Sequence, residues 1–284
     1  MQEEAKLIVK AIESLRSEPN LFKDYIFPIA SAFFSAILGG AVALLFFRYQ
    51  EKISVEKHKM NSVNKWTLLA DEARANLISI KQNYHGTLTE KPIQRALAIP
   101  SVLFSSQSIK ENYSELYFIV PKAGAGKIAK WSQIPRIRAM IHNYNYLQEL
   151  WLKRNEIEGP ITEAVLKMYS DKAHADVTLD EVLSCVGAVQ LSSLVDLTEH
   201  VVKLTDDILV ELDSFLEEFP AYAKTLIKYK KMKRYGAILT YSKNEDVNLL
   251  EIFNKSPQAN YESIVDLFGV SQEALQSRYV TGYE

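Results

Sequence analysis

The hydrophobic pattern of the chain is dominated by a continuous apolar stretch from Tyr25 to Phe47, which contains no Asp, Glu, Lys, Arg or His. A helix of this length spans roughly 35 Å, and the hydrocarbon core of a bilayer is roughly 30 Å thick. The stretch is longer than the apolar region of a usual signal peptide and continues past Ala41–Ala43, where a small-residue cleavage pattern occurs. We therefore expect a retained transmembrane helix at residues 25–48, surrounded by lipid bilayer.

Small residues form two adjacent columns along this predicted helix, and together they are called the small-residue strip. The first column is Ser31, Ser35, Gly39 and Ala43, and the second is Ala32, Ala36 and Gly40. In lipid, such strips let helix backbones approach closely and pack. We expect the chain to self-associate through the strip. The open alternative is that small residues are simply common in membrane helices.

The residues that flank the span indicate the structure of the N-terminal tail and the orientation of the span in the membrane. The N-terminal tail, residues 1–24, has apolar side chains at helical spacing over residues 3–17. This pattern predicts an amphipathic helix that lies on the membrane or packs on a neighbouring subunit. Lys and Arg are slightly more numerous after the span than before it, which places the C-terminal domain in the cytoplasm.

Beyond the span, helical spacing with few breakers predicts a mainly α protein. Residues 49–62 are rich in charge and are expected to form a solvated stalk, followed by a helical-bundle domain at 63–235. The predicted long helices are 48–84, 128–158, 178–217 and 221–235, with breaks at Gly159–Pro160 and Phe219–Pro220 and a capping box at Thr178–Glu181. Residues 236–284 alternate short β-prone and helical stretches, which predicts a small mixed appendage with a hairpin near 237–241.

The predicted helix 178–217 carries a line of carboxylates, which we expect to face solvent. They are Asp180, Glu199, Asp206, Asp207, Glu211 and Asp213. A metal site in a helical bundle needs Glu-x-x-His pairs, and the sequence has none.

The densest positive charge lies in the predicted helix 221–235 and is called the basic cluster. Its members are Lys228, Lys230, Lys231, Lys233 and Arg234. Such a cluster can hold an anionic ligand or an acidic protein partner. The alternative is a helix whose charges match the acidic helix before it.

Composition excludes several classes of function. The chain has 284 residues, a net charge of −2 and one cysteine, so neither nucleic-acid binding nor an internal disulfide framework is expected. Gly124–Lys127 resembles the end of a phosphate-binding loop but lacks its first glycine and its Ser or Thr. Five histidines are scattered without ligand spacing, and no catalytic motif is present. We expect no enzyme activity, no cofactor and no metal.

Two short motifs carry a resemblance to a known group of proteins. They are Glu72-Ala-Arg-Ala-Asn76-Leu77 and His142-Asn-Tyr-Asn145-Tyr146. Over residues 25–155 the chain resembles a loosely defined group of bacterial single-span membrane proteins with a cytosolic helical domain. The resemblance implies an inner-membrane location and a part in stress or phage defence, and it supplies no catalytic residue.

The patterns leave two functions open. In the first, the protein is a membrane-anchored effector or sensor that is oligomeric through its span. Its cytosolic domain then responds to a bound ligand or partner. In the second, it is a passive anchor or scaffold that holds a soluble partner protein at the membrane.

Overall fold

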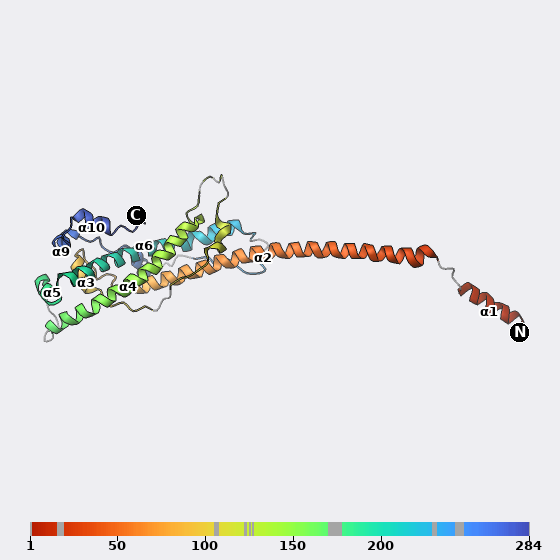
Figure 1. The fold of residues 1–284 in the computed structure, drawn as a ribbon, viewed down its shortest axis with the longest axis horizontal. Helices are drawn as coiled ribbons and strands as arrows, with labels where there is room; N and C mark the ends of the chain where they lie inside the picture. Colours follow the sequence, from red (N-terminus) through yellow and green to blue (C-terminus); the bar gives the residue numbers. More distant parts are fainter. Residues whose placement is uncertain are drawn as a thin grey trace. The chain divides into compact units, whose positions relative to one another are not determined.

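The structure, a computed structural model, is mainly helical over the residues that it describes (Figure 1). Those residues are 2–15, 20–104, 108–121, 124, 126, 128–169, 178–228, 232–241 and 247–283. The chain divides into two compact units, Met1–Glu56 and Lys57–Glu284. The expectation of a mainly α protein is confirmed.

The first unit is helical. Helix α1 spans Gln2–Leu15, a π-helical segment spans Phe22–Ile26, and α2 spans Phe27–Gln82, so that α2 contributes residues to both units. The stretch Phe22–Gln82 is long and apolar enough to cross a membrane, and no residue of its apolar window is buried within the chain. The expected long apolar helix near the N-terminus is therefore confirmed in length and composition.

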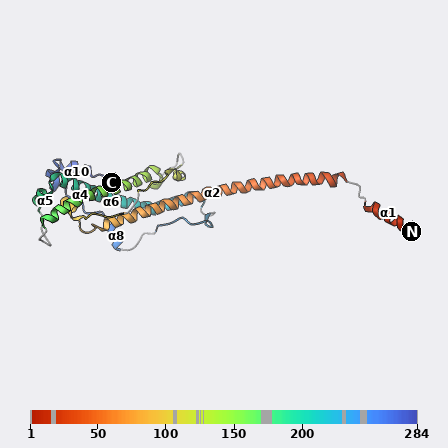
Figure 2. The ribbon, with the colours of Figure 1, turned by 60° about the horizontal axis from the view of Figure 1, so that its bottom comes forward.

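The core of the second unit is a bundle of long helices. Its members are the part of α2 from Lys57 onward, α4 (Ile134–Met168) and α6 (Ala188–Leu226). They lie side by side in Figure 1, and Figure 2 shows the same arrangement from another side. Aromatic rings fill the space between them: Tyr84 of the turn after α2 stacks on Trp151 of α4, with ring centroids 5.8 Å apart. Burial of such rings contributes strongly to the stability of a core.

The predicted helix 178–217 is two helices. The expected capping box is confirmed, because the Thr178 side chain accepts from the Glu181 backbone and Glu181 bonds back. Helix α5 (Leu179–Val186) then ends at Gly187, and α6 leaves at an angle of 111°. Gly187 has φ 86° and ψ 152°, a conformation that side-chain-bearing residues rarely adopt. The prediction of one continuous helix was wrong because a single glycine makes this bend.

Two prolines that were expected to break helices lie inside them. Pro160 lies within α4, and Pro220 lies within α6. A proline in a helix interior costs about 3 kcal/mol because it removes a hydrogen bond and crowds the preceding turn. Here the next turns are buried, with Ile161 at 1% exposure and Ala223 at 0%. Packing of these turns offsets the cost, so each helix continues.

Short helical elements connect and cover the bundle. They are α3 (Pro92–Ala98), η2 (Tyr113–Ile119), η3 (Lys130–Ser132), α8 (Val247–Phe253), η4 (Tyr261–Ile264), α9 (Val265–Phe268) and α10 (Gln272–Arg278). No strand occurs among the residues that the structure describes, so the hairpin expected near 237–241 is not found there.

The C-terminal segment, residues 254–283, packs on the second unit. Ile264, Leu275 and Tyr279 are buried in one cluster with Leu191 and Leu194 of α6. This contact holds the polar residues of the C-terminal segment beside one face of α6.

Candidate functional site

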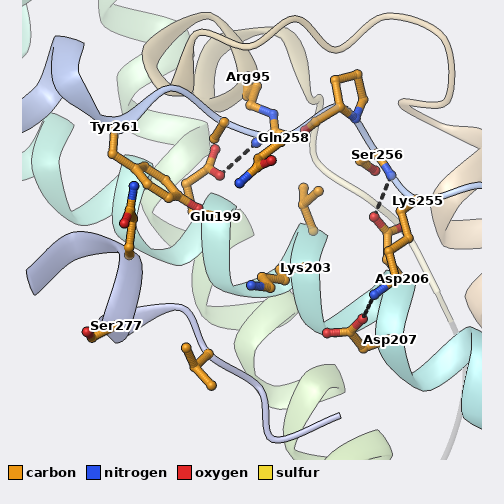
Figure 3. A pocket seen from close by; sticks show the side chains of 15 residues that line it. Arg95, Glu199, Lys203, Asp206, Asp207, Lys255, Ser256, Gln258, Tyr261 and Ser277 are labelled. Atoms are coloured by element: carbon orange, nitrogen blue, oxygen red, sulfur yellow. Dashed lines mark hydrogen bonds and ion pairs between the residues drawn. The ribbon is translucent and has the colours of Figure 1, made fainter. Parts of the chain in front are cut away.

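A polar pocket of about 730 Å³ lies between α6, α3 and the C-terminal segment (Figure 3). Arg95 lines it from α3, and Val202, Lys203 and three carboxylates line it from α6. The C-terminal segment supplies residues 255–259, Tyr261, and residues 276, 277 and 280. All of these belong to the second unit, and the cavity is hereafter called the polar pocket.

Helical spacing places the α6 residues of the polar pocket on one face. Glu199, Lys203 and Asp206 follow one another at intervals of four and three residues, so their side chains project from successive turns on the same side. Figure 3 shows them in this order along α6, with Lys203 between Glu199 and Asp207. The regular helix thus sets the order of charges along the pocket wall.

Glu199 forms a buried ion pair with Arg95. The distance from Arg95 Nη1 to Glu199 Oε2 is 2.7 Å, and the side chains are 3% and 2% exposed. Arg95 also donates through Nη2 to the carbonyl of Pro257 at 2.6 Å, which connects the pair to the C-terminal segment. Burial raises the pKa of Glu199 to about 7, and the opposing effects of Arg95 and the Tyr261 hydroxyl are smaller. This carboxyl group therefore changes charge near neutral pH.

Asp206 connects α2 to the C-terminal segment. Its Oδ1 lies 2.5 Å from Lys81 Nζ, and its Oδ2 accepts from the backbone N–H of Ser256 at 2.7 Å. Lys81 donates in turn to the Asn254 carbonyl at 2.6 Å. Because the Lys81 and Asp206 side chains are 1% and 6% exposed, water does not screen this pair appreciably.

The neighbouring Asp207 also holds the C-terminal segment. Lys255 Nζ lies 2.7 Å from Asp207 Oδ1, and the Thr281 hydroxyl donates to Oδ2 at 2.5 Å. Outside the pocket, Arg278 binds both carboxylate oxygens of Asp196 at 2.6 Å. Polar contacts from α6 therefore fasten the C-terminal segment at several points along its length.

The chemistry of the polar pocket suits binding. Its three carboxylates already take part in the pairs described above, and the other polar groups of the lining supply hydrogen-bond donors. These are the hydroxyls of Ser256 and Ser277 and the amides of Gln258 and Gln276. Within the described part of the chain, no three His, Cys, Asp or Glu side chains are grouped so that they could hold a metal ion.

The described members of the basic cluster, Lys228, Lys233 and Arg234, do not line the polar pocket. Helix α6 ends at Leu226 because Ile227 turns to an extended conformation (φ −104°, ψ 141°), so the expected helix 221–235 is wrong. Lys228 is exposed, Lys233 and Arg234 lie in an exposed turn, and Arg234 Nη2 donates to the Tyr235 hydroxyl at 2.6 Å. The remaining members, Lys230 and Lys231, lie outside the described residues.

The small-residue strip lies within α2 in the first unit. All seven of its residues are exposed. A Cβ atom added at Gly39 or Gly40 would meet no atom within 4 Å. The strip is therefore open to contact with another molecule.

The residues of the polar pocket were not predicted as a site. Glu199, Asp206, Asp207 and Glu211 were expected to face solvent, but they are only 2%, 5%, 3% and 6% exposed. That expectation was wrong because their cationic partners come from distant parts of the chain, such as Lys81 and Arg136. The sequence feature that could have indicated this site is the density of carboxylates beside the apolar side of one long helix.

No protein-family model matches the chain, no curated protein matches it, and no solved structure matches it.

Proposed function

We propose that this protein is a single-span, membrane-anchored sensor or effector whose helical domain binds a small polar ligand. The observation that carries the proposal is the polar pocket between α6 and the C-terminal segment. Its volume falls within the roughly 300–1,000 Å³ of ordinary small-molecule sites. Two buried ion pairs, Arg95–Glu199 and Lys81–Asp206, fix part of its charge, so this part of the lining is organised before a ligand arrives. Binding, without a catalytic step, is the proposed role.

The proposed anchor is the apolar part of α2. The helical stretch has the required length and composition, and its apolar window is unburied in the chain. An apolar surface of this size is unfavourable in water, and a bilayer would cover it. By the resemblance to bacterial single-span proteins we place it in an inner membrane, with the C-terminal domain in the cytoplasm and a part in stress or phage defence.

We propose that the protein transmits ligand binding by self-association through the small-residue strip. In lipid, small residues allow close packing between helices, and the strip has open space around it. Helix α2 contains both the strip and Lys81, which bonds to Asp206 in the wall of the polar pocket. We propose that occupation of the pocket alters this contact and so biases the packing of the spans.

The test is substitution of the strip in the full chain. Gly39→Leu combined with Gly40→Leu would fill the strip without a clash inside the chain, because nothing lies within 4 Å. We expect the double variant to lose its oligomeric state in membranes, measured by cross-linking. Phe33→Leu, which changes a bulky residue off the strip, is the control. Unchanged assembly of the double variant would overturn self-association through this face.

The scaffold function predicts a different result. If the protein only anchors a soluble partner, replacing residues 25–48 with an unrelated single-pass span should preserve its cellular effect. The sensor function predicts loss of that effect, because the replacement span lacks the strip. Retained function in this chimaera would favour the scaffold.

A further inference from the structure

We propose that the basic cluster, joined by Lys57 of α2, binds the anionic headgroups of a lipid bilayer. This inference rests on the proposed membrane anchor, which brings a bilayer to the chain, and it goes further because it gives the helical domain a membrane contact of its own. The described residues that carry it are Lys57, Lys228, Lys233 and Arg234, all in the second unit.

Two segments that contact each other form this surface, and neither contains an acidic residue. Residues 221–244 include seven Lys or Arg and residues 57–70 include three Lys, without one Asp or Glu in either range. One of these cations, Lys65, pairs with Glu111 and Glu115 from another part of the chain. The remaining charge is concentrated, so the local potential is positive although the whole chain has a net charge of −2.

Contacts with α2 hold the backbone that follows the basic cluster. Asn64 of α2 donates through Nδ2 to the carbonyl of Ala237 and accepts through Oδ1 from the N–H of Leu239, both at 2.9 Å. Lys57 Nζ lies 5.4 Å from the centre of the Tyr235 ring, within the range of a cation–π contact. The basic cluster is therefore held beside the beginning of the second unit, at Lys57.

Buried apolar side chains alternate with the cations of this segment. Ile227, Met232 and Ile238 are buried, whereas Lys228 and Lys233 are exposed. The buried side chains fix the segment to the domain, since each gains from removal of its apolar surface from water. The positive charges are consequently displayed on the surface of a segment that is packed in place.

Exposed apolar side chains accompany the cations. Leu226, Tyr235 and Leu239 are each more than a third exposed. The guanidinium of Arg234 lies 4.7 Å from the centre of the Tyr235 ring and donates to the Tyr235 hydroxyl, a neutral group that leaves the charge of Arg234 in place. Cations beside aromatic and apolar side chains are typical of surfaces that lie at a membrane interface.

The place of Lys57 in the sequence favours lipid over an acidic protein partner. It follows Phe47, the last residue of the apolar stretch, by ten residues of one continuous helix. Ten helical residues rise about 15 Å, and headgroups extend roughly 5–8 Å beyond the hydrocarbon core. The remaining distance is comparable to the screening length of roughly 10 Å at 0.1 M salt. Connectivity thus keeps Lys57 within electrostatic reach of the headgroups.

Amide hydrogen exchange on the full chain in lipid nanodiscs tests the inference. The probes are nanodiscs of phosphatidylcholine alone and of phosphatidylcholine with roughly 30% phosphatidylglycerol, an anionic lipid. We expect residues 232–241 to exchange at least about threefold more slowly in the anionic nanodiscs. Salt at about 1 M, where the screening length is roughly 3 Å, should remove the difference.

Substitution of the described members of the basic cluster should abolish the lipid dependence. The variant combines Lys228→Gln, Lys233→Gln and Arg234→Gln, all at exposed positions. Lys57→Gln alone should reduce the difference between the two nanodiscs, and it keeps the test decisive if the triple variant fails to fold.

A matched control removes the same amount of charge from other segments. It combines Lys91→Gln, Lys153→Gln and Lys167→Gln, which are also at exposed positions. This variant should keep the full difference in exchange between neutral and anionic nanodiscs. Loss of the difference in the control would show that overall charge, and not this surface, is responsible.

The outcomes separate this inference from the proposed function. Equal exchange in both nanodiscs, or a lipid dependence that both cluster variants retain, would overturn the inference and leave self-association through the strip intact. Protection in neutral nanodiscs by inorganic phosphate would assign the surface to a free anion, and protection by an oligoglutamate peptide alone would assign it to an acidic protein; each result overturns lipid binding. A chain that neither nanodisc retains would overturn the membrane anchor together with the inference.

Discussion

Arg95 and Glu199 are 104 residues apart in the chain, yet their side chains meet at 2.7 Å in a site from which water is almost excluded. The pair joins α3 to α6 and forms one end of the polar pocket. A buried ion pair is weak evidence of net stability, because desolvation offsets the attraction, but loss of one partner leaves an uncompensated charge. The pair therefore fixes the pocket wall more than it stabilises the fold.

The first prediction concerns the pH dependence of stability. The pKa of Glu199 is about 7 in the folded protein, against an ordinary value of 4.5. Between these two pH values, Glu199 is protonated in the folded state and deprotonated in the unfolded state. Stability should therefore fall as pH rises from about 4.5 to about 7, by up to about 3 kcal/mol, and then level off.

Glu199→Gln should flatten that slope. Arg95 from α3, Tyr261 from η4 and Tyr279, directly after α10, are the other ionisable groups that act on or are affected by Glu199. Urea unfolding in detergent at a series of pH values, followed by tryptophan fluorescence, measures the effect. The exposed Glu273→Gln is the control. An unchanged slope in Glu199→Gln would show that another group titrates.

The second prediction concerns Arg154, which is 0% exposed in α4. Its guanidinium donates to the carbonyls of Ala96, Ile99 and Pro100 and to the Thr198 hydroxyl. It thereby fixes the end of α3 beside α6. Arg154→Met should lower the free energy of unfolding by about 3 kcal/mol or more, because buried acceptors lose a charged donor. The neighbouring exposed Lys153→Met should change it by less than about 0.5 kcal/mol. Equal effects of the two substitutions on the free energy of unfolding would contradict the stabilising role of Arg154.

The third prediction uses two glycines with open space around them. Gly187→Ala should destabilise the protein by about 1–3 kcal/mol, since φ 86° is strained for alanine. Gly159→Ala, inside α4, should instead stabilise it by about 0.5–1 kcal/mol through helix propensity. Thermal unfolding measures both. Changes in stability of the same sign for the two variants would contradict the strained conformation assigned to Gly187.

The fourth prediction concerns how the C-terminal segment is fastened. Arg278 binds Asp196 bidentately, but its side chain is 53% exposed. Arg278→Gln should cost less than about 1 kcal/mol of overall stability. It should nevertheless increase amide hydrogen exchange in residues 272–283, because a local anchor is lost. Exchange mass spectrometry with Glu273→Gln as the control checks this, and unchanged exchange would show that the apolar contacts alone hold the segment.

Local patterns in the sequence predicted the mainly helical content and the long apolar helix well, but they predicted several helix ends and the site poorly. The apolar stretch, the mainly α content and the capping box at Thr178–Glu181 each depend on neighbouring residues, and the structure confirms them. The breaks at Pro160 and Pro220 were wrong because burial of the following turns overrides the local cost.

The polar pocket could not be predicted from local patterns, because the residues that pair with each other in its wall are distant in sequence. Lys81 and Asp206 are 125 residues apart, and no local pattern relates them. The spacing of the α6 carboxylates is that of a solvated helix face. Whether such a face is buried depends on which cations the fold brings to it, and the local sequence does not contain that information. The basic cluster was conspicuous because its residues are adjacent in sequence, which is no guide to a cavity.

Native mass spectrometry of the full chain released from membranes tests the central claim most directly. A membrane-anchored, self-associating sensor should appear as a discrete oligomer that carries additional small-molecule mass. The Gly39→Leu and Gly40→Leu double variant should appear as a monomer that keeps this mass. A bare wild-type monomer, or a stoichiometric complex with one other protein, would contradict the sensor function and favour the scaffold.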